Sequence, residues 1–401
     1  MNVLILAQYF PPDLGGAATR AYNLAKGLTL NGCNVTVIAA VPHYPHGNIP
    51  PEYRWKPLKV EWMGKIKVIR TFMPPIKSIG FFKRLVLIGA FTISSQFALP
   101  FAGKIDVVWA SSWAPGYIYS KTKRKPLALN VDDLTLEDLV DLDLLDKNSF
   151  SLKIGEVVYR LFFVKGDILT PISYDYFETI SKKYCVEPSR IHLVRGGVDL
   201  SVFKPSQSNN QSKKKFVVLY SGAFSVAYDF EQIFKAAKII EKVDSDIEFV
   251  VQGAGELLGS MLNSVSKLKV KNVKIINKIL SRAEVAELLG QADVLILPLA
   301  SFCKSGKPYR GMSSKLYEYQ AVGKPIICCS KGVPSTYVEE TCSGLVVNPG
   351  DSEALAKAIL ELKRNPSLSQ MMGKNGRKFV ENESSLESIG STTKKIFEQL
   401  I

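Results

Sequence analysis

Short apolar runs alternate with amphipathic stretches along most of the chain. The run VLILA at residues 3–7 has the length and branching of a strand buried on both faces, and residues 17–30 carry apolar side chains near helical spacing. The same succession of strand, loop and helix continues to residue 173 and restarts at residue 216. This alternation predicts parallel sheets covered by helices.

A polar segment divides this pattern into two halves. KPSQSNNQSKKK, at residues 204–215, contains few apolar residues and has the composition of a linker. We therefore expect an α/β protein of two doubly wound parallel-sheet domains, residues 1–200 and 216–383, joined by a linker at 201–215 and facing each other across a cleft. The last helical segment, 384–401, is expected to pack back onto the first domain.

The loop after the first strand contains two adjacent glycines, Gly15 and Gly16. A loop at the carboxyl end of a parallel strand lies next to the N-terminus of the following helix, so glycine there lets a phosphate or a sugar approach the backbone N–H groups. The spacing matches neither the dinucleotide-binding GxGxxG motif nor the P-loop. Taken alone, the two glycines fit a tight turn equally well.

Composition and cysteine usage narrow the class of protein. The chain has 401 residues, of which 46% are hydrophobic, as expected for a globular protein with more than one domain. Its six cysteines form no CxxC pair and show no metal-like spacing with the three histidines, so we expect reduced thiols in a cytosol and no structural zinc. The first strand begins at the N-terminus, which argues against a cleavable signal.

Positive charge is concentrated in the first third of the chain. Residues 1–131 contain 16 Lys and Arg against 4 Asp and Glu, which gives +12 of the formal net charge of +14. Such a surface suits nucleic acid or phospholipid headgroups, and aromatic residues set among the charges suit a membrane interface. The basic residues are Arg54, Lys56, Lys59, Lys65, Lys67, Arg70, Lys83 and Arg84, and the aromatic ones are Trp55, Trp62, Phe72, Phe81 and Phe82.

The apolar segment at residues 80–104 also concerns contact of the first domain with a membrane. It has no charge between Arg84 and Lys104, yet it contains several polar residues and a proline. Because a spanning helix needs about 20 predominantly apolar residues, a helix partly in the core and partly at a bilayer surface is favoured over a transmembrane span. The competing interpretation is that the aromatic residues of this region form core and its charges form a solvated face.

The stretch YRGMSSKLYEYQAVGKPIICCS, at residues 309–330, holds the strongest chemical signal. Ser313 or Ser314 would cap a helix whose first N–H groups point toward the cleft and could hold a diphosphate. Lys315 in the first turn opposes the helix dipole unless an anion lies beside it. Glu318, one turn later, could accept hydrogen bonds from a ribose. An ordinary capped surface helix would not explain a lysine in the first turn.

Taken together, several stretches resemble the retaining glycosyltransferases of family 4, whose two Rossmann-like domains form the GT-B fold. The resemblance rests on the double-glycine loop, RIHLVRGGVDLSVF, FVVQGAGE, VKIINKILSRAEV, ADVLILPL, and EYQAVGKPII followed by SGLVVNPGDSEALAKAI. Each motif is loose, but their order and spacing are specific and cover nearly the whole chain. VPHYPHG, DDLTLED and SSKLYEYQAVGKP look like the enzymes that build surface polysaccharides, some of which transfer N-acetylated deoxyhexosamines.

The resemblance implies a donor site in the second domain. Glu318 would bind the ribose of a nucleotide sugar, and the backbone around Lys315 would touch the donor sugar and its phosphates. The other expected donor-site residues are the loop glycines Gly15, Gly16, Gly222, Gly253 and Gly255, the base-framing Lys278, Ile279 and Leu280, and Arg310, Gly311, Met312, Ser313, Ser314 and Leu316.

Two departures from the family pattern concern charge. Arg310 stands where the family has the first glutamate of an E-x7-E pair, which leaves the identity of the donor sugar open. Ala223 and Asp229 stand where the family has Arg and Lys. The phosphate charge would then be met by Lys315, Arg310 and helix dipoles.

A retaining enzyme of this type has no evident protein nucleophile. The diphosphate would leave and the acceptor hydroxyl would enter on the same face, so catalysis would consist of positioning and stabilisation of leaving-group charge. Asp133, at the end of the strand PLALNV, is the candidate polar group near the reacting centre, and a solvated acidic loop explains it equally well. His43 and His46 are candidate acceptor-binding residues, although two surface histidines would explain that loop as well.

We therefore expect an enzyme that transfers a sugar, such as an N-acetylated hexosamine or deoxyhexosamine, from a UDP-linked donor to a lipid-linked acceptor in surface or glycoprotein glycan biosynthesis. It would be peripheral at the cytoplasmic face of the cell membrane, with an anionic membrane surface as a partner and with no cofactor or metal. Nucleic-acid binding would explain the charge alone and nothing in the second half. The alternatives are a sugar-nucleotide epimerase and a catalytically silent nucleotide-sugar-binding relative.

Overall fold

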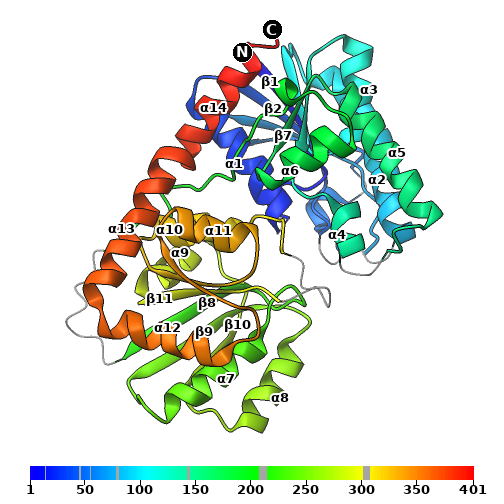
Figure 1. Cartoon of the computed structure of the whole chain (residues 1–401). Helices are drawn as coiled ribbons and strands as arrows, with labels where there is room; N and C mark the ends of the chain where they lie inside the picture. Colours follow the sequence, from blue (N-terminus) through cyan, green and yellow to red (C-terminus); the bar gives the residue numbers. More distant parts are fainter. Residues whose placement is uncertain are drawn as a thin grey trace. The chain divides into compact units, whose positions relative to one another are not determined.

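The chain folds into two compact units. The computed structural model describes residues 1–13, 15–44, 47–54, 56–77, 81–141, 145–206, 215–300 and 308–401. The first unit holds Met1–Val140, Leu145–Gly197 and Ser385–Ile401, and the second holds Val198–Ser384 together with Asp141. Each unit is a sheet with helices on both faces (Figure 1). The two parallel-sheet α/β domains predicted from the alternating pattern are thereby confirmed.

Among the described residues, the sheet of the first unit has seven strands in the order β3-β4-β2-β1-β5-β6-β7. Their bounds are β1 (Asn2–Leu6), β2 (Asn34–Ala40), β3 (Leu58–Met63), β4 (Ile66–Thr71), β5 (Val107–Ala110), β6 (Leu127–Val131) and β7 (Ile168–Pro171). β3 and β4 form an antiparallel pair at one edge, and the other strands run parallel. The central strand β1 is apolar throughout its middle because helices cover both faces of the sheet.

The helices of the first unit include the C-terminal one. They are α1 (Gly16–Leu30), α2 (Phe81–Ala98), α3 (Trp113–Lys123), α4 (Thr135–Asp141, whose last residue is grouped with the second unit), α5 (Phe150–Lys165), α6 (Asp175–Glu178) and α14 (Leu386–Glu398), with the short 3-10 and π-helical segments η1 (Pro51–Tyr53), η2 (Leu99–Phe101), η3 (Thr179–Lys183) and η4 (Pro188–Arg190). α1 and α14 touch backbone to backbone, since a Cβ atom on Gly390 would lie 2.1 Å from the carbonyl oxygen of Gly27. Ile396 and Phe397 of α14 are buried in the core of this unit.

In the part of the chain that is described, the second unit has a six-stranded parallel sheet in the order β10-β9-β8-β11-β12-β13. The strands are β8 (Phe216–Ala223), β9 (Ile247–Ala254), β10 (Val273–Asn277), β11 (Val294–Pro298), β12 (Ile326–Cys329) and β13 (Gly344–Val347). The helices are α7 (Phe230–Glu241), α8 (Leu258–Leu268), α9 (Arg282–Gln291), α10 (Ser314–Ala321), α11 (Val333–Glu340), α12 (Ser352–Arg364) and α13 (Pro366–Glu383). Side chains cap several of them, and Ser281 and Glu284 form a complete capping box at the start of α9.

The boundary between the units lies between Gly197 and Val198. Val198 and Phe203 are fully buried in the core of the second unit, among residues of β8, β11 and α10. The residues expected at the end of the first domain and at the start of the linker therefore belong to the second unit. Residues 207–214 of the expected linker lie outside the described residues.

Candidate functional site

The carboxyl ends of β8 and β9 in the second unit come very close together. Gly222 and Gly253 are paired in register there, and their φ angles of +155° and +154° are disfavoured for residues with a Cβ atom. A Cβ atom on Gly253 would lie 1.7 Å from the carbonyl oxygen of Gly222. The two glycines therefore add no side chain of their own at this edge of the sheet, which leaves room for one from a neighbouring element.

Lys315 reaches this edge from α10. A Cβ atom on Gly222 would lie 2.1 Å from Cε of Lys315, so the aliphatic part of the lysine occupies space that a glycine leaves free. Its Nζ donates a hydrogen bond to the Tyr228 hydroxyl at 2.9 Å and lies 4.8 Å from the centre of that ring. The tyrosine fixes the ammonium group without neutralising it, and its charge can still attract an anion.

The N-terminus of α10 adds hydrogen-bond donors next to Lys315. Ser313 is the N-cap residue, its side chain makes no capping hydrogen bond, and the first turn contains no acidic residue. The first N–H groups of an α-helix have no partners within the helix, and the helix dipole makes this end positive. Together with Lys315, this end of α10 favours an anionic group such as a diphosphate.

Glu318 lies one turn further along α10. Its side chain is 12% exposed, and its Oε1 accepts a hydrogen bond from the Arg282 guanidinium at 2.6 Å. Arg282 in turn lies over the ring of Phe203, 4.7 Å from its centre. A carboxylate accepts several hydrogen bonds, so this pairing leaves capacity for a ribose hydroxyl.

The turn after β10 presents an apolar side chain to solvent. The amide of Gln252 donates to the carbonyl oxygen of Lys278 at 2.6 Å, which fixes the turn, and Lys278 also pairs with Glu284 at 3.2 Å. Ile279, the next residue, is 63% exposed. A fixed, exposed apolar side chain is suited to pack against a planar base.

Arg20 organises the corresponding edge of the first unit. It is buried on α1, and its guanidinium donates to Oδ1 of Asn130 at 3.0 and 2.8 Å and to the carbonyl oxygens of Val194 and Arg195. It also pairs with Asp132 at 2.6 Å. One side chain thus joins the first helix, the end of β6 and the segment after η4. Arg20 gives no signal of this role in the sequence, because a polar residue in an amphipathic helix is expected to face solvent.

Asp133 follows this anchored strand end. Desolvation by the surrounding protein and the negative charge of the neighbouring Asp132 raise the pKa of Asp133 to about 6, while the positive charge of Arg20 opposes the shift. Its side chain nevertheless reaches solvent. A carboxyl group that titrates near neutral pH can hold or release a proton under physiological conditions.

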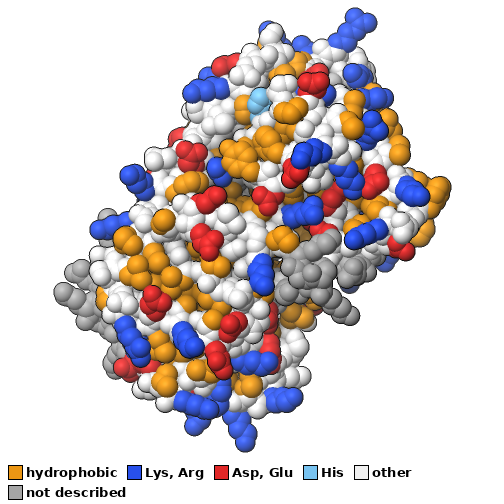
Figure 2. Space-filling model, in the orientation of Figure 1, with side chains coloured by type: hydrophobic (Ala, Val, Ile, Leu, Met, Phe, Trp, Pro, Cys, Tyr) orange, Lys and Arg blue, Asp and Glu red, His pale blue; other side chains and the backbone are white. Residues whose placement is uncertain are grey.

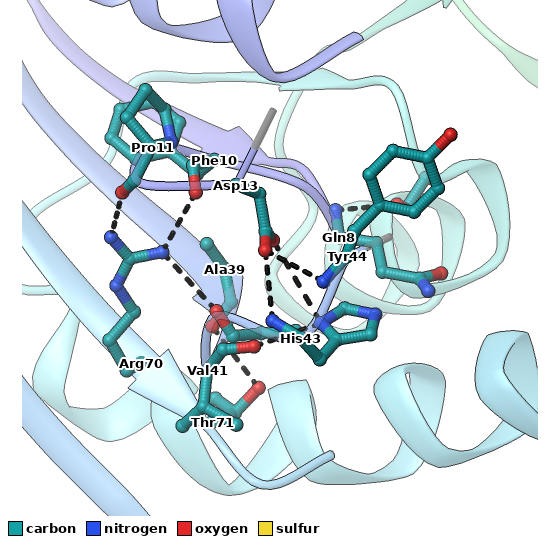
Figure 3. Close-up of polar contacts among 12 residues, drawn as sticks. Gln8, Phe10, Pro11, Asp13, Ala39, Val41, His43, Tyr44, Arg70 and Thr71 are labelled. Carbon is teal, nitrogen blue, oxygen red and sulfur yellow. Dashed lines mark hydrogen bonds and ion pairs between the residues drawn. The ribbon is translucent and has the colours of Figure 1, made fainter. Parts of the chain in front are cut away.

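A buried polar cluster follows β1 and β2 (Figure 3). Asp13 is 5% exposed, and its Oδ1 accepts hydrogen bonds from the backbone N–H groups of His43 at 2.8 Å and Tyr44 at 2.9 Å. Nδ1 of His43 lies 2.9 Å from the carbonyl oxygen of Val41. Burial raises the pKa of Asp13, and these N–H groups and the charge of Arg70 oppose the shift. Asp13 therefore fixes the loop that carries His43.

Arg70 corrects one expectation about the basic surface. Its side chain is 0% exposed, although the sequence analysis placed it among the residues of a charged, aromatic surface. It pairs with Glu61 at 2.8 Å and donates hydrogen bonds to the carbonyl oxygens of Phe10, Pro11 and Ala40 (Figure 3). A guanidinium always carries its charge, so a buried one needs this many partners. Arg70 stabilises the fold and is not available to a membrane.

The expected residues of the histidine loop and of the aromatic surface are only partly described. His43 is 3% exposed, which excludes the interpretation of it as a surface histidine. His46 and Trp55 lie outside the described residues. Trp62, Phe72 and Phe82 are exposed and stay available to a partner.

Two family profiles together match most of the chain. The family described as Glycosyltransferase Family 4 matches residues 14–202, and the family described as Glycosyl transferases group 1 matches residues 203–379. The chain is a glycosyltransferase of family 4. The enzyme class that the sequence motifs implied is therefore confirmed.

Two relatives of this glycosyltransferase are named for lipid-linked substrates. A GDP-mannose-dependent monoacylated alpha-(1-6)-phosphatidylinositol monomannoside mannosyltransferase from Corynebacterium glutamicum is 27% identical over 306 residues, 74% of this chain and 77% of the relative. A UDP-Gal:alpha-D-GlcNAc-diphosphoundecaprenol alpha-1,3-galactosyltransferase from Escherichia coli is 24% identical over 216 residues, 51% of this chain and 53% of the relative. The structure of sucrose-phosphate synthase from Thermosynechococcus elongatus matches with a TM-score of 0.78 at 17% identity, over 100% of this chain and 98% of that chain, and shows the shared fold.

Several expected donor residues of the glycosyltransferase have other contacts in the structure. The Leu316 side chain is 0% exposed, so it could meet a donor only through its backbone. Arg310 pairs with Asp141 at 3.1 Å. Asp229, which is not expected in the site because it replaces a basic residue of the family pattern, caps α7 by accepting a hydrogen bond from the backbone N–H of Gln232. The remaining expected residues, just before α10 and at its first position, are buried or half-buried: Gly311, Met312, Ser313 and Ser314.

Four of the five expected donor-site glycines lie at positive φ, and Gly222 and Gly253, described above, lie at the ends of β8 and β9. Gly15 is the N-cap residue of α1 at φ +111°, and Gly255 has φ +157°. A Cβ atom on Gly16 would meet no atom within 4 Å, so the start of α1 is open. Among the residues that the structure describes, no group of three or more His, Cys, Asp and Glu side chains is arranged to hold a metal ion.

Proposed function

We propose that this glycosyltransferase is a retaining enzyme that takes a sugar from a UDP-linked donor and transfers it to a lipid-linked acceptor at the cytoplasmic face of the cell membrane. The observation that carries the donor half is the meeting of Lys315 and the open N-terminus of α10 beside Gly222, with Glu318 one turn away. The acceptor half is supported by the lipid-linked substrates named for the relatives. The transferred sugar is an N-acetylated hexosamine or deoxyhexosamine in this proposal.

The donor site is proposed to work without a metal. The bond between the sugar and the diphosphate breaks, negative charge grows on the leaving diphosphate, and the Lys315 ammonium group and the α10 N–H groups stabilise it. The acceptor hydroxyl attacks the sugar carbon on the same face and gives its proton to the departing diphosphate. The protein's contribution is the fixed position of these donors.

A panel of donors and acceptors tests the proposal. The purified enzyme is incubated with UDP-N-acetylglucosamine, UDP-N-acetylgalactosamine, UDP-glucose or GDP-mannose, each with and without GlcNAc-diphosphoundecaprenol, and each with and without EDTA. Release of UDP that needs the lipid acceptor and survives EDTA, with an α-linked product by NMR, is the expected result. A changed sugar without acceptor would indicate an epimerase, and no turnover with any pair would indicate a silent protein.

Attachment to the membrane is proposed through one helical layer of the first unit. α3 contacts both α2 and α5. Their exposed side, here called the outer helix face, carries large hydrophobic side chains (Figure 2 shows hydrophobic side chains at the edge of the unit where α5 lies). These are Phe82, Leu85, Val86, Ile88, Ile93 and Phe97 of α2, Phe101 next to it, Ile118 of α3, and Phe150, Ile154, Val157, Val158, Leu161 and Val164 of α5.

The charges on the same three helices suit anionic lipid. α2, α3 and α5 carry seven Lys and Arg and one Glu. Each basic side chain near an anionic bilayer contributes about 1 kcal/mol, and exposed apolar side chains add interfacial burial. Residues Phe82–Phe101 are long and apolar enough to cross a membrane, but Leu87 and Phe91 are packed in the core of the first unit. Peripheral docking by the outer helix face is therefore favoured over a span.

A further inference from the structure

We infer that Gln8 and His43 form a subsite in the first unit that binds one hydroxyl group of the acceptor. The inference rests on the proposed function, since it assumes a hydroxyl-bearing acceptor. Gln8 follows β1 and His43 follows β2, and these neighbouring strands are parallel, so the two residues come to the same edge of the sheet. The Ala40 N–H group donates to the carbonyl oxygen of Gln8 at 3.2 Å and holds the two strand ends together.

The contacts of His43 fix which ring nitrogen carries the proton. A carbonyl oxygen only accepts hydrogen bonds, so Nδ1, which lies 2.9 Å from the Val41 oxygen, must be the N–H donor. In a neutral imidazole the other nitrogen, Nε2, then has a free lone pair and is an acceptor. This Nε2 atom is buried and has no hydrogen-bond partner within the described part of the chain.

Gln8 supplies the opposite kind of group. Its backbone is fixed, because its N–H group donates to the Ser112 hydroxyl at 3.0 Å. Its side chain is 7% exposed, and the Nε2 amide nitrogen, a donor, is buried without a partner among the described residues. In Figure 3 the Gln8 amide extends toward the His43 ring. An unpaired acceptor and an unpaired donor therefore lie at one strand edge.

A hydroxyl group fits this pair because it donates and accepts at the same time. It can donate to Nε2 of His43 and accept from Nε2 of Gln8, whereas a phosphate oxygen could only accept and an ammonium group could only donate. Tyr9 stacks on the His43 ring at 5.5 Å between centroids, and Tyr44 packs edge-on against Tyr9 at 5.1 Å. Apolar ring faces beside a few fixed polar groups are the usual lining of a small-molecule site. The ligand class is a neutral polyol, which an acceptor sugar supplies.

The histidine allows a matched pair of variants. His43→Asn keeps an N–H donor near the position of Nδ1 but has no atom at the position of Nε2. His43→Gln places its amide oxygen near the position of Nε2 and so keeps the acceptor. Gln8→Glu turns the donor into a second acceptor, which a single hydroxyl cannot satisfy. His192→Asn makes the same chemical change at a half-buried histidine elsewhere in the first unit and serves as the control.

The test measures KM for GlcNAc-diphosphoundecaprenol in mixed micelles, the slow hydrolysis of the donor by water, and Tm. His43→Asn and Gln8→Glu are expected to raise the acceptor KM about tenfold, the effect of one lost hydrogen bond, with donor hydrolysis unchanged. His43→Gln and His192→Asn are expected to stay within about twofold of the wild type.

Each outcome of this test either supports or overturns the inferred subsite. If the wild type transfers sugar and His43→Asn leaves the acceptor KM unchanged while lowering Tm, the histidine is only structural and the subsite is wrong, although the proposed function stands. An equal loss in His43→Asn and His43→Gln also overturns the subsite, because both would then act through the fold. If the wild type hydrolyses the donor but transfers to no lipid acceptor, the proposed function fails, and the inferred subsite fails with it.

Discussion

The two units share one architecture but expose different surfaces. Each is a mainly parallel sheet between layers of helices. Among the described residues, 26 large hydrophobic side chains are exposed, and 21 of them belong to the first unit against 5 in the second. The outer helix face alone carries 14. The same layered fold therefore leaves much more apolar surface exposed in the first unit, as the proposed docking to a lipid bilayer requires.

The carboxyl edges of the two sheets differ in how they treat charge. In the first unit, Arg20 and Arg70 are buried and neutralised by carboxylates of the same unit. In the second unit, Lys315 has a neutral partner, the Tyr228 hydroxyl. A charge that the protein pairs internally holds the fold together, whereas a charge left beside a neutral group is suited to an ionic ligand. This difference supports the anion site proposed at the second edge and the neutral-ligand subsite inferred at the first.

Among the predicted variants, loss of Lys315 should have the largest effect on activity. Lys315→Ala is expected to lower kcat/KM about 100-fold, because it removes the cation that meets the growing charge of the leaving diphosphate. Steady-state release of UDP measures this. Lys267→Ala, an exposed lysine on α8 of the same unit, is the control and should leave the rate unchanged. A Lys315→Ala variant with wild-type kcat/KM would remove Lys315 from the donor site.

Variants of Glu318 and Arg282 test whether the second edge binds the ribose of UDP. Glu318→Ala is expected to weaken UDP binding by about 1 to 3 kcal/mol, since a ribose hydroxyl loses its acceptor in a partly desolvated site. Arg282→Ala removes only the exposed partner of that carboxylate, so UDP affinity should change little. Calorimetry with UDP compares the two variants. Equal affinity of the wild type and Glu318→Ala would show that Glu318 serves only Arg282.

The sequence predicts the sheets of both units because their strands are short, apolar and regularly spaced. It also predicts the helix that carries Lys315 from its N-cap candidates, and the cation in the first turn of that helix indicates a bound anion. It does not reveal Arg20, whose partner Asn130 lies 110 residues away, or the pairing of Arg282 with Glu318. Side-chain partners at such distances are set by tertiary packing alone.

The outer helix face shows a second limit of sequence analysis. Residues 150–165 form α5, which has apolar residues around much of its circumference. The pattern tells which side chains are apolar, but not which of them the sheet leaves uncovered. In the opposite direction, Arg70 looks like a surface charge in sequence and is fully buried in the structure. Exposure is a property of the packed unit and cannot be read along the chain.

The difference in exposed apolar surface predicts which unit binds lipid. A variant with Val157→Ser and Leu161→Ser on α5 is expected to bind vesicles of phosphatidylglycerol and phosphatidylcholine about tenfold more weakly, because it loses interfacial apolar area. Val243→Ser with Leu262→Ser makes the same change at exposed positions of the second unit and should have no effect. Sedimentation with vesicles measures both.

Charge is the second part of the same prediction. Lys83→Ser with Arg84→Ser should weaken binding to anionic vesicles, and high salt should reduce wild-type binding by screening. Equal partitioning of the wild type to neutral and anionic vesicles would contradict the charge contribution. No binding to either kind of vesicle would contradict the docking of the outer helix face altogether.

The smallest expected effect concerns Asp133, at the edge of the first unit. Its pKa in the folded protein, about 6, lies above the ordinary value of 3.8, so folding disfavours the ionised carboxyl group. The stability that this group contributes is therefore greatest below about pH 4 and decreases as the pH rises toward 6. Asp133→Asn should match the wild type in Tm at pH 4 and have a higher Tm at pH 7.5, with a gain in the free energy of unfolding of about 1 kcal/mol or less because the side chain reaches solvent. Thermal unfolding at the two pH values measures this, with Asp246→Asn, an exposed aspartate of the second unit, as the control. A Tm difference that is the same at both pH values would show that the charge of Asp133 is not destabilising, and the first edge would then lose its only proposed titrating group near the reacting centre.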